Sequence, residues 1–170
     1  RVMGMIPAKA LATTCIVEDP DFLWPIPDHW TMEEASTVPC VYATAYYSLI
    51  IRGNLKRGER VLIHSGSGGV GQAAINICLH YNCDIYVTVG TEDKKRFLIE
   101  NYGLREDRIF NSRDTQFKYQ IMSATNGKGV NLVLNSLTGD KLDASFQVVS
   151  KNGRFVEIGK YDLIMNKRLG

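Results

Sequence analysis

A glycine-rich run, Gly66-Ser67-Gly68-Gly69-Val70-Gly71, has the G-x-G-x-x-G spacing of loops that bind the pyrophosphate of a dinucleotide. In such loops the first glycine permits a tight turn, the second lets the backbone approach the pyrophosphate, and the third lets a helix pack closely on a strand. The positive end of the helix dipole then faces the phosphates. Gln72 and Ala73 follow where a P-loop carries Lys and Ser or Thr, which excludes a P-loop nucleotidase. We therefore predict that all six residues of the run contact a dinucleotide.

Basic side chains further along the chain bear on which dinucleotide is bound. Glu92 lies near the place, about 20 residues past the glycines, where NAD enzymes carry an acid. However, Thr91 and Glu92 also have the pattern of a helix start, and the preceding strand ends in Val89-Gly90 without an acid at its tip. Basic residues nearby are suited to a 2′-phosphate or to a solvated helix face. We predict NADPH, with contacts from Thr91, Lys94, Lys95 and Arg113.

The glycine run is part of a regular alternation of strands and helices that begins at Glu59. The strands are nearly continuous in apolar residues, which is typical of a parallel sheet covered on both faces. The expected strands are 60–64, 84–89, 108–110, 130–134 and 154–158, and the expected helices are 69–81, 92–101, 115–125 and 141–149. The fold class predicted for this portion is therefore α/β, a Rossmann-type doubly wound parallel sheet.

The first part of the chain has a different pattern. Short extended segments at 2–6 and 11–17, broken by prolines, predict antiparallel strands. Thr31 and Glu34 fit a capping box that begins a short helix, and a second, buried helix is expected from Pro39 to Ile51. We therefore predict two parts: residues 1–53, the end of a substrate domain with a connecting helix, and residues 54–170, a dinucleotide-binding domain truncated at its C-terminus.

Composition excludes several other classes of protein. The 170 residues carry a net charge of +2, too even for a disordered tail or a polybasic nucleic-acid binder. The longest mostly apolar stretch, 38–51, is shorter than the roughly 20 residues of a membrane span. Four cysteines without a CxxC pair favour reduced thiols in the cytoplasm over a zinc ribbon or a disulfide scaffold. Because the chain starts at Arg1 without Met, we expect it to be a segment of a longer multienzyme.

The segment His64–Ala74 resembles the cofactor loop of medium-chain dehydrogenases/reductases and, more narrowly, that of the enoyl reductase domain of animal fatty acid synthase. Enoyl reductase modules of polyketide synthases share much of the pattern and are the nearest alternative. The resemblance covers nearly the whole chain in order. It includes Arg1-Val2-Met3-Gly4-Met5, Val41-Tyr42-Ala43-Thr44-Ala45-Tyr46-Tyr47, Asn111-Ser112-Arg113-Asp114-Thr115, Val133-Leu134-Asn135-Ser136-Leu137 and Glu157-Ile158-Gly159-Lys160.

The resemblance implies a reaction and its participants. NADPH would deliver hydride to the β-carbon of a trans-2-enoyl thioester on an acyl carrier protein, and the α-carbon would then be protonated. The substrate domain would be mostly β and GroES-like, no metal such as zinc would be bound, and the other partners would be further domains of the same multienzyme, itself a homodimer.

The resemblance also assigns residues. Lys160, directly after the fifth strand, matches a lysine that donates the proton or stabilises the enolate. Thr44 is expected near the nicotinamide. Asn135 and Ser136 end the fourth strand, where polar side chains reach the ribose or carboxamide. By contrast, His64 has no identifiable carboxylate partner and is predicted to be structural.

Two other functions remain open at this point. One is a stand-alone quinone or enone reductase of the same superfamily. The other is a dinucleotide-binding module that keeps the fold without chemistry, against which the intact glycines and Lys160 are weak evidence.

Overall fold

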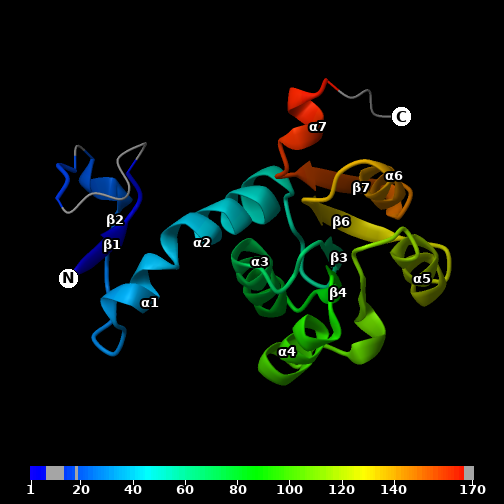
Figure 1. Cartoon of the computed structure of the whole chain (residues 1–170), viewed down its shortest axis with the longest axis horizontal. Helices are drawn as coiled ribbons and strands as arrows, with labels where there is room; N and C mark the ends of the chain where they lie inside the picture. Colours follow the sequence, from blue (N-terminus) through cyan, green and yellow to red (C-terminus); the bar gives the residue numbers. More distant parts are fainter. Residues whose placement is uncertain (7–13, 18, 167–170) are drawn as a thin grey trace.

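A five-stranded parallel sheet forms the centre of the molecule in a computed structural model that describes residues 1–6, 14–17 and 19–166. Its strand order is β5-β4-β3-β6-β7, with each neighbouring pair parallel (Figure 1). The strands are β3 (Arg60–Ile63), β4 (Asp84–Val89), β5 (Ile109–Asn111), β6 (Val130–Asn135) and β7 (Val149–Glu157). The predicted Rossmann-type sheet is confirmed, and the helices between the strands fall where the sequence pattern predicts them, within a few residues.

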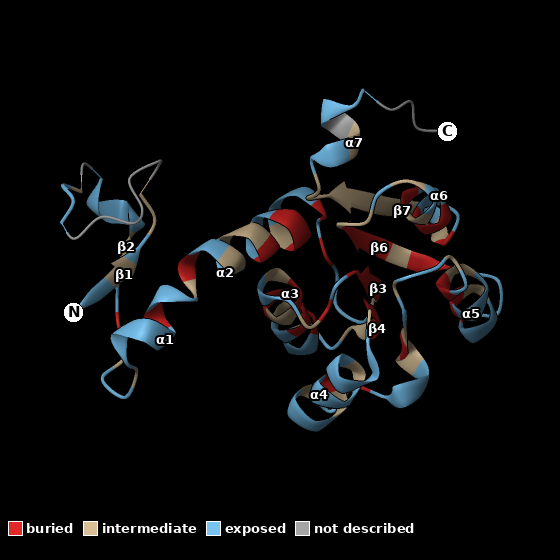
Figure 2. Cartoon of the chain, viewed as in Figure 1, coloured by how far each residue is buried: buried red, intermediate tan, exposed pale blue. Residues whose placement is uncertain are grey.

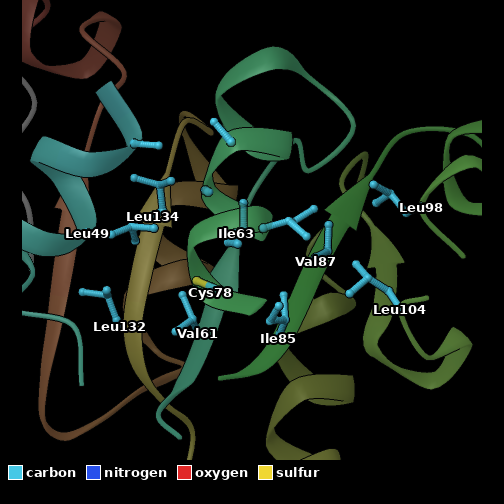
Figure 3. Close-up of a cluster of buried hydrophobic side chains, with 14 of the residues drawn as sticks. Leu49, Val61, Ile63, Cys78, Ile85, Val87, Leu98, Leu104, Leu132 and Leu134 are labelled. Carbon is cyan, nitrogen blue, oxygen red and sulfur yellow. The ribbon is translucent and has the colours of Figure 1, made fainter. Parts of the chain in front are cut away.

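Helices cover both faces of this sheet. The helices are α3 (Gly69–His80), α4 (Glu92–Tyr102), α5 (Phe117–Ala124) and α6 (Asp140–Phe146), with a short 3-10 turn η3 (Glu106–Arg108). On one face, Val61 and Ile63 pack with Cys78 of α3 and Leu98 of α4 (Figure 3). On the other face, Leu62 packs with buried residues of α5 and α6. Alternate residues of one strand thus enter two cores, as the pleat requires.

Local signals in the sequence set the ends of α4. Thr91 is the N-cap, and its hydroxyl accepts a hydrogen bond from the Lys94 backbone N–H at 3.4 Å. Gly103 ends the helix at φ 62°, a left-handed conformation that glycine adopts without strain. The cap at Thr91 begins α4 two residues after the end of β4, so the first turn of α4 lies at the tip of this strand.

The first part of the chain is less regular. β1 (Val2–Gly4) lies in the first predicted strand and is antiparallel, as expected, but its partner is β2 (Leu23–Pro25), which was not predicted. A 3-10 turn, η1 (Pro20–Phe22), precedes β2. Figure 1 shows this pair beyond the end of the helices that lead to the sheet. Of the strand expected at 11–17, residues 11–13 lie outside the described part of the chain, and 14–17 form no strand. That the segment belongs to a mostly-β, GroES-like domain stays a prediction, as does the division at residues 53 and 54.

The connecting helix is only partly buried, which corrects the expectation from its composition. α1 (Met32–Ser36) begins with the predicted capping box at Thr31 and Glu34, and α2 (Pro39–Tyr46) continues into a π-helical segment η2 (Tyr47–Arg52). Its inner face enters the core through Ala45 and Leu49. Its outer face exposes Tyr46 (54%), Tyr47 (57%) and Ile51 (57%). Figure 2 shows exposed, intermediate and buried residues in turn along this helix. The reason is geometric: within the described residues only one face of this helix meets α3 and the sheet.

A last short helix, α7 (Tyr161–Ile164), follows β7 and was not predicted. No helix in the described part of the chain has both the length and the apolar character needed to cross a membrane.

Candidate dinucleotide-binding site

The carboxyl ends of β3 and β6 form the topological switch point of the sheet. From β3 the chain crosses to β4 on one side, whereas β6 pairs with β3 on the other side. Ligands of open α/β sheets bind in the crevice at such a point. A cleft of about 270 Å³ lies here, and its lining includes Ser65, Gly68, Gly69, Val70, Gly71 and Ser136. The structure thus brings most of the glycine run together with Ser136, as the sequence predicts.

The glycines of the run differ in what surrounds them. Gly66 and Gly71 are buried, and a Cβ on Gly66 would lie 2.1 Å from Val87 Cγ1. A Cβ on Gly71 would lie 2.5 Å from the Ser65 carbonyl oxygen. Gly68 is exposed on the cleft, and the nearest atom to its Cβ would be the same oxygen at 3.3 Å. Protein packing therefore requires glycine at 66 and 71, whereas at 68 the open cradle suits a closely approaching ligand.

The first turn of α3 opens on this cleft. Gly68 is the N-cap of α3 and no side chain caps the helix. The backbone N–H groups of the first turn are therefore available to donate hydrogen bonds to an anion, and the helix dipole favours negative charge at this end. This arrangement fits the pyrophosphate of a dinucleotide.

Ser65 is a site residue that the sequence pattern does not mark. Its φ of 56° is a left-handed conformation that is uncommon for a residue with a side chain. Its carbonyl accepts a hydrogen bond from the Gly68 N–H at 2.9 Å, which closes the turn. Its Oγ lies 3.3 Å from Ser136 Oγ, so the two hydroxyls join the ends of β3 and β6. The only signal in the sequence is its place directly before the glycines.

His64 is structural, as predicted. The side chain is buried between two hydroxyls, with Nδ1 2.8 Å from Thr88 Oγ1 and Nε2 2.8 Å from Ser145 Oγ. Its ring also meets the Phe117 ring edge-on. Burial lowers the pKa of His64 to about 3, so the imidazole is neutral at physiological pH. It is therefore no proton donor to a ligand in the cleft.

The tip of β4 gathers the groups predicted to meet a 2′-phosphate. Arg113 Nε donates to the Gly90 carbonyl at 2.7 Å, which holds the guanidinium over the strand end. Thr91 and Lys95 line a second hollow of about 190 Å³ at this tip, together with Glu92 and Asn111. Lys95 Nζ lies 3.0 Å from Glu106 Oε1, while the Lys94 side chain is exposed on the first turn of α4. The carbonyl of Gly90 is already used by Arg113, and no acid ends the strand.

Asn135 has a different place from Ser136. Its side chain is fully buried, and Nδ2 donates to the Leu137 carbonyl at 2.8 Å and to Glu157 Oε2 at 2.6 Å. Glu157 Oε1 in turn accepts from the Gly159 N–H at 2.6 Å. Burial raises the pKa of Glu157. Asn135 thus joins the loops that follow β6 and β7, and its contact with a cofactor stays a prediction.

Thr44 and Lys160 lie at the edge of the site. Thr44 lines a larger cleft of about 690 Å³ between the connecting helix and β7, and its hydroxyl donates to the Cys40 carbonyl at 2.7 Å. Ile158 lines both this cleft and the one beside the glycine run. Lys160 follows two residues later with an exposed side chain, and its carbonyl accepts from the Ile164 N–H of α7 at 2.9 Å.

The sequence of the chain matches a known protein family. The sequence model of a family described as zinc-binding dehydrogenase covers residues 69–167, more than half of the chain. The chain belongs to the zinc-binding dehydrogenase family. Among solved structures it resembles the CurK enoyl reductase at 38% identity with a TM-score of 0.79, over 88% of this chain and 45% of that one.

A second solved structure shows which members of the zinc-binding dehydrogenase family the chain resembles. It is the nucleotide-binding subdomain of the enoylreductase domain of PpsC from Mycobacterium tuberculosis, 40% identical with a TM-score of 0.72. The match covers 77% of this chain and 72% of that one. The chain therefore belongs with the nucleotide-binding subdomains of enoyl reductase domains.

Curated relatives of this zinc-binding dehydrogenase chain are polyketide synthases. A highly reducing polyketide synthase of Gibberella moniliformis is 51% identical over 145 residues, which are 85% of this chain and 6% of that protein. Polyketide synthase 37 of Dictyostelium discoideum is 47% identical over 138 residues, which are 81% of this chain and 5% of that protein. The chain thus spans only a small part of the length of these relatives.

The name of the zinc-binding dehydrogenase family raises the question of a metal. Within residues 1–6, 14–17 and 19–166, no three His, Cys, Asp or Glu side chains come together as ligands for an ion. The described residues therefore do not fit a zinc ion.

The cofactor of such reductases is a nicotinamide dinucleotide, and NADPH is consistent with the enoyl reductase type. The residues present fit it: an uncapped helix N-terminus, an open cradle at Gly68 and basic groups at the tip of β4.

Proposed function

We propose that this chain is the cofactor-binding part of the enoyl reductase of a reducing polyketide synthase. The observation that carries the proposal is the glycine cleft at the switch point of a sheet whose solved relatives are enoyl reductases. The fatty acid synthase assignment from the sequence is a weaker proposal, because the curated relatives described above are polyketide synthases. The division of the chain into the end of a substrate domain, residues 1–53, and a dinucleotide-binding domain, residues 54–170, is part of the proposal.

The proposed substrate is an α,β-unsaturated thioester carried on an acyl carrier protein. When bound, NADPH supplies the hydride that the β-carbon receives, and a proton added at the α-carbon completes the saturated thioester. The other domains of the synthase would be the further partners, in a homodimeric parent. This chain's own residues bind the dinucleotide, hold it at the mouth of the cleft and provide the proton donor.

The glycine run and the tip of β4 would bind different phosphates of the dinucleotide. The amides of the first turn of α3 would hold the pyrophosphate, and Gly68 and Gly69 leave room for it. Arg113, with Lys94, Lys95 and Thr91 at the start of α4, would hold the 2′-phosphate. Ser136, Asn135 and Thr44 remain proposed contacts of the ribose and nicotinamide end.

Lys160 is the proposed proton donor. It follows the edge strand β7 at the carboxyl end of the sheet, two residues after Ile158, which lines both clefts. Its exposed ammonium carries a proton that it can give to the α-carbon, and its charge stabilises the enolate that forms before protonation.

The first experiment measures binding and turnover separately. NADPH binding is followed by cofactor fluorescence on this chain, and consumption of NADPH with a crotonyl thioester is followed in the complete reductase domain. Binding with turnover supports the proposal. Binding without turnover of any enoyl thioester favours the binding-module alternative, and turnover of free quinones or enones in preference to thioesters favours the stand-alone reductase.

Lys160→Ala should lower the turnover of the crotonyl thioester about 100-fold while the KM for NADPH stays within about twofold, because general acids contribute on this scale. Lys151→Ala is the matched control, since Lys151 is an equally exposed lysine of β7 away from the carboxyl end. Unchanged turnover in Lys160→Ala would remove the role assigned to this residue.

A further inference from the structure

Gln72 connects the glycine loop to helix α4. It lies in the first turn of α3, directly after Gly71, and its side chain is half-buried. Its Nε2 donates to the Ser67 carbonyl at 2.8 Å, and its Oε1 accepts from the Tyr102 hydroxyl at 2.8 Å. Both polar ends of the amide are therefore engaged, one on the loop and one on the last residue of α4.

The hydrogen bond to Ser67 has a specific effect on the loop. A trans peptide is planar, so the Ser67 carbonyl and the Gly68 N–H belong to one rigid unit. Gln72 holds the carbonyl end of this unit, and the Ser65 carbonyl holds the N–H end at 2.9 Å. The peptide is thus fixed at both ends and cannot rotate to turn its carbonyl oxygen toward a bound phosphate.

Tyr102 determines which way the amide of Gln72 faces. Its hydroxyl donates to the amide oxygen, which leaves the NH₂ group for Ser67. Burial raises the pKa of Tyr102, so the hydroxyl keeps its proton at physiological pH. The ring packs edge-on against Phe97 of α4, which limits its movement. The result is a directed chain of two hydrogen bonds from α4 to the tip of the loop.

We propose that Gln72 and Tyr102 are positioning residues that hold the Ser67–Gly68 peptide with its carbonyl oxygen turned away from the pyrophosphate, which the amides of the first turn of α3 bind. This inference rests on the proposed binding of NADPH. Neither residue touches the cofactor in the proposed arrangement. They act through the loop: Tyr102 orients Gln72, and Gln72 orients the peptide.

The test uses three single variants of this chain. Tyr102→Phe removes only the hydroxyl, and Gln72→Met keeps a side chain of similar length without polar atoms. Tyr42→Phe is the matched control, because the Tyr42 hydroxyl also bonds a side-chain amide of α3, accepting from Asn76 Nδ2 at 2.7 Å, but Asn76 lies one turn of the helix beyond Gln72. The dissociation constant of NADPH is measured by cofactor fluorescence, and the unfolding midpoint of each variant is measured alongside.

We expect the dissociation constant of NADPH to rise about 3–10-fold in Tyr102→Phe and more in Gln72→Met, which loses both hydrogen bonds. Tyr42→Phe should bind as the wild type does. Binding of 2′-AMP, which has no pyrophosphate, should be unchanged in all three variants. A purely structural role would weaken both ligands in proportion to the fall in unfolding midpoint, and that result would overturn the inference.

A double variant gives the sharpest discrimination. If Tyr102 acts through Gln72, adding Tyr102→Phe to Gln72→Met should cause no further loss of NADPH affinity. Additive losses would contradict the proposed chain of contacts, as would wild-type affinity in both single variants. If the wild-type chain itself fails to bind NADPH, the proposed function fails instead, which separates the two outcomes.

Discussion

Glycines of the same loop serve two different purposes at the scale of single residues. Gly66 and Gly71 are buried where a side chain would collide with β4 or with the loop backbone. A Cβ on Gly68 would meet the Ser65 carbonyl oxygen at 3.3 Å, a close contact but no collision, and the residue lies exposed on the cleft. The spacing of the motif therefore combines a packing requirement and a ligand requirement that substitution can separate.

Gly66→Ala should mainly lower the stability of the chain, whereas Gly68→Ala should mainly weaken cofactor binding. Gly66→Ala places a Cβ 2.1 Å from Val87 Cγ1 and should lower the free energy of unfolding by about 1–3 kcal/mol. Gly68→Ala should leave the unfolding free energy within about 0.5 kcal/mol and weaken NADPH binding at least tenfold. Urea unfolding and fluorescence titration measure the two effects. A Gly68→Ala chain that binds NADPH normally would contradict the ligand requirement.

His64 makes the stability of the fold depend on pH. Its pKa is about 3 in the folded chain, whereas the ordinary value is 6.5. The unfolded chain therefore takes up the proton first as pH falls, and stability is lost from about pH 6.5 downward, by at most about 1.4 kcal/mol per pH unit.

His64→Gln should be less stable than the wild type near pH 7 but should have a flatter pH profile between about pH 6.5 and pH 4. Carboxylates titrate in both proteins, so the difference between the two profiles isolates His64. Urea unfolding at several pH values measures it. Parallel profiles would show that His64 does not stay neutral in the folded state.

The spacing of the glycines and the residue types at strand ends were enough to predict much of the site. Gly68, Gly69 and Ser136 line one cleft as expected, and Arg113 lies at the tip of β4. Ser65, Gln72 and Tyr102 were not predicted, because their importance comes from contacts and from a backbone conformation. No pattern in the sequence indicates that Tyr102, 30 positions after Gln72, donates a hydrogen bond to it.

One arginine joins three elements at the scale of strands and helices. Arg154 of β7 bonds both carboxylate oxygens of Glu59 at 2.8 and 2.7 Å, beside the start of β3. Its Nε also donates to the Gly53 carbonyl at 2.8 Å, at the end of the connecting helix. The hydrogen bonds from Arg154 lower the pKa of Glu59, so the pair stays charged. This cluster fixes the helix end against two strands of the sheet.

Arg154→Lys should lower the free energy of unfolding by about 1–3 kcal/mol, because lysine has no planar fork to bond a carboxylate and a carbonyl together. The matched control is Arg105→Lys, since Arg105 also pairs with a carboxylate, that of Asp107, but both side chains are mostly exposed. That control should change stability by less than about 0.5 kcal/mol. If urea unfolding shows the same loss of unfolding free energy in both variants, the Arg154 cluster stabilises the fold no more than an exposed ion pair does.

Elements with a strong local pattern were predicted closely, and those that depend on surroundings were not. The apolar strand at 84–89 and the helix starting at Glu92 match β4 and α4. The connecting helix was expected to be buried, because small and apolar residues cover most of it. Its exposed outer face could not be foreseen, since periodicity does not tell which neighbours are present.

At the scale of the whole molecule, two hydrophobic cores stabilise the sheet from opposite faces. The net charge is only +2, so the molecule has no broadly basic surface. Recognition of phosphates therefore depends on local groups. The glycine cleft lies at the centre of the sheet, whereas the basic groups lie at the end of β4. A ligand with phosphates at both places links α3, β4 and α4.

NADPH should stabilise the folded chain by about 2.7 kcal/mol at a concentration 100 times its dissociation constant. NADH at the same concentration should stabilise it less, because no 2′-phosphate meets Arg113. In Arg113→Ala the difference between the two cofactors should become smaller, with the remainder due to Lys94, Lys95 and Thr91. Unfolding midpoints measured with each cofactor test this. Equal stabilisation of the wild type by NADH and NADPH would contradict the proposed role of Arg113.

The central place of β3 also determines when the cleft is completed during folding. Val61 of β3 pairs with Ile85 on one side, which is close along the chain, and with Leu132 on the other, which is far away. Closing the longer loop costs more chain entropy, and parallel pairing over such separations is slow. The glycine loop thus acquires its β4 side early and its Ser136 side late. Binding of a dinucleotide that needs both sides should therefore report when β6 has paired with β3, a long-range step in folding.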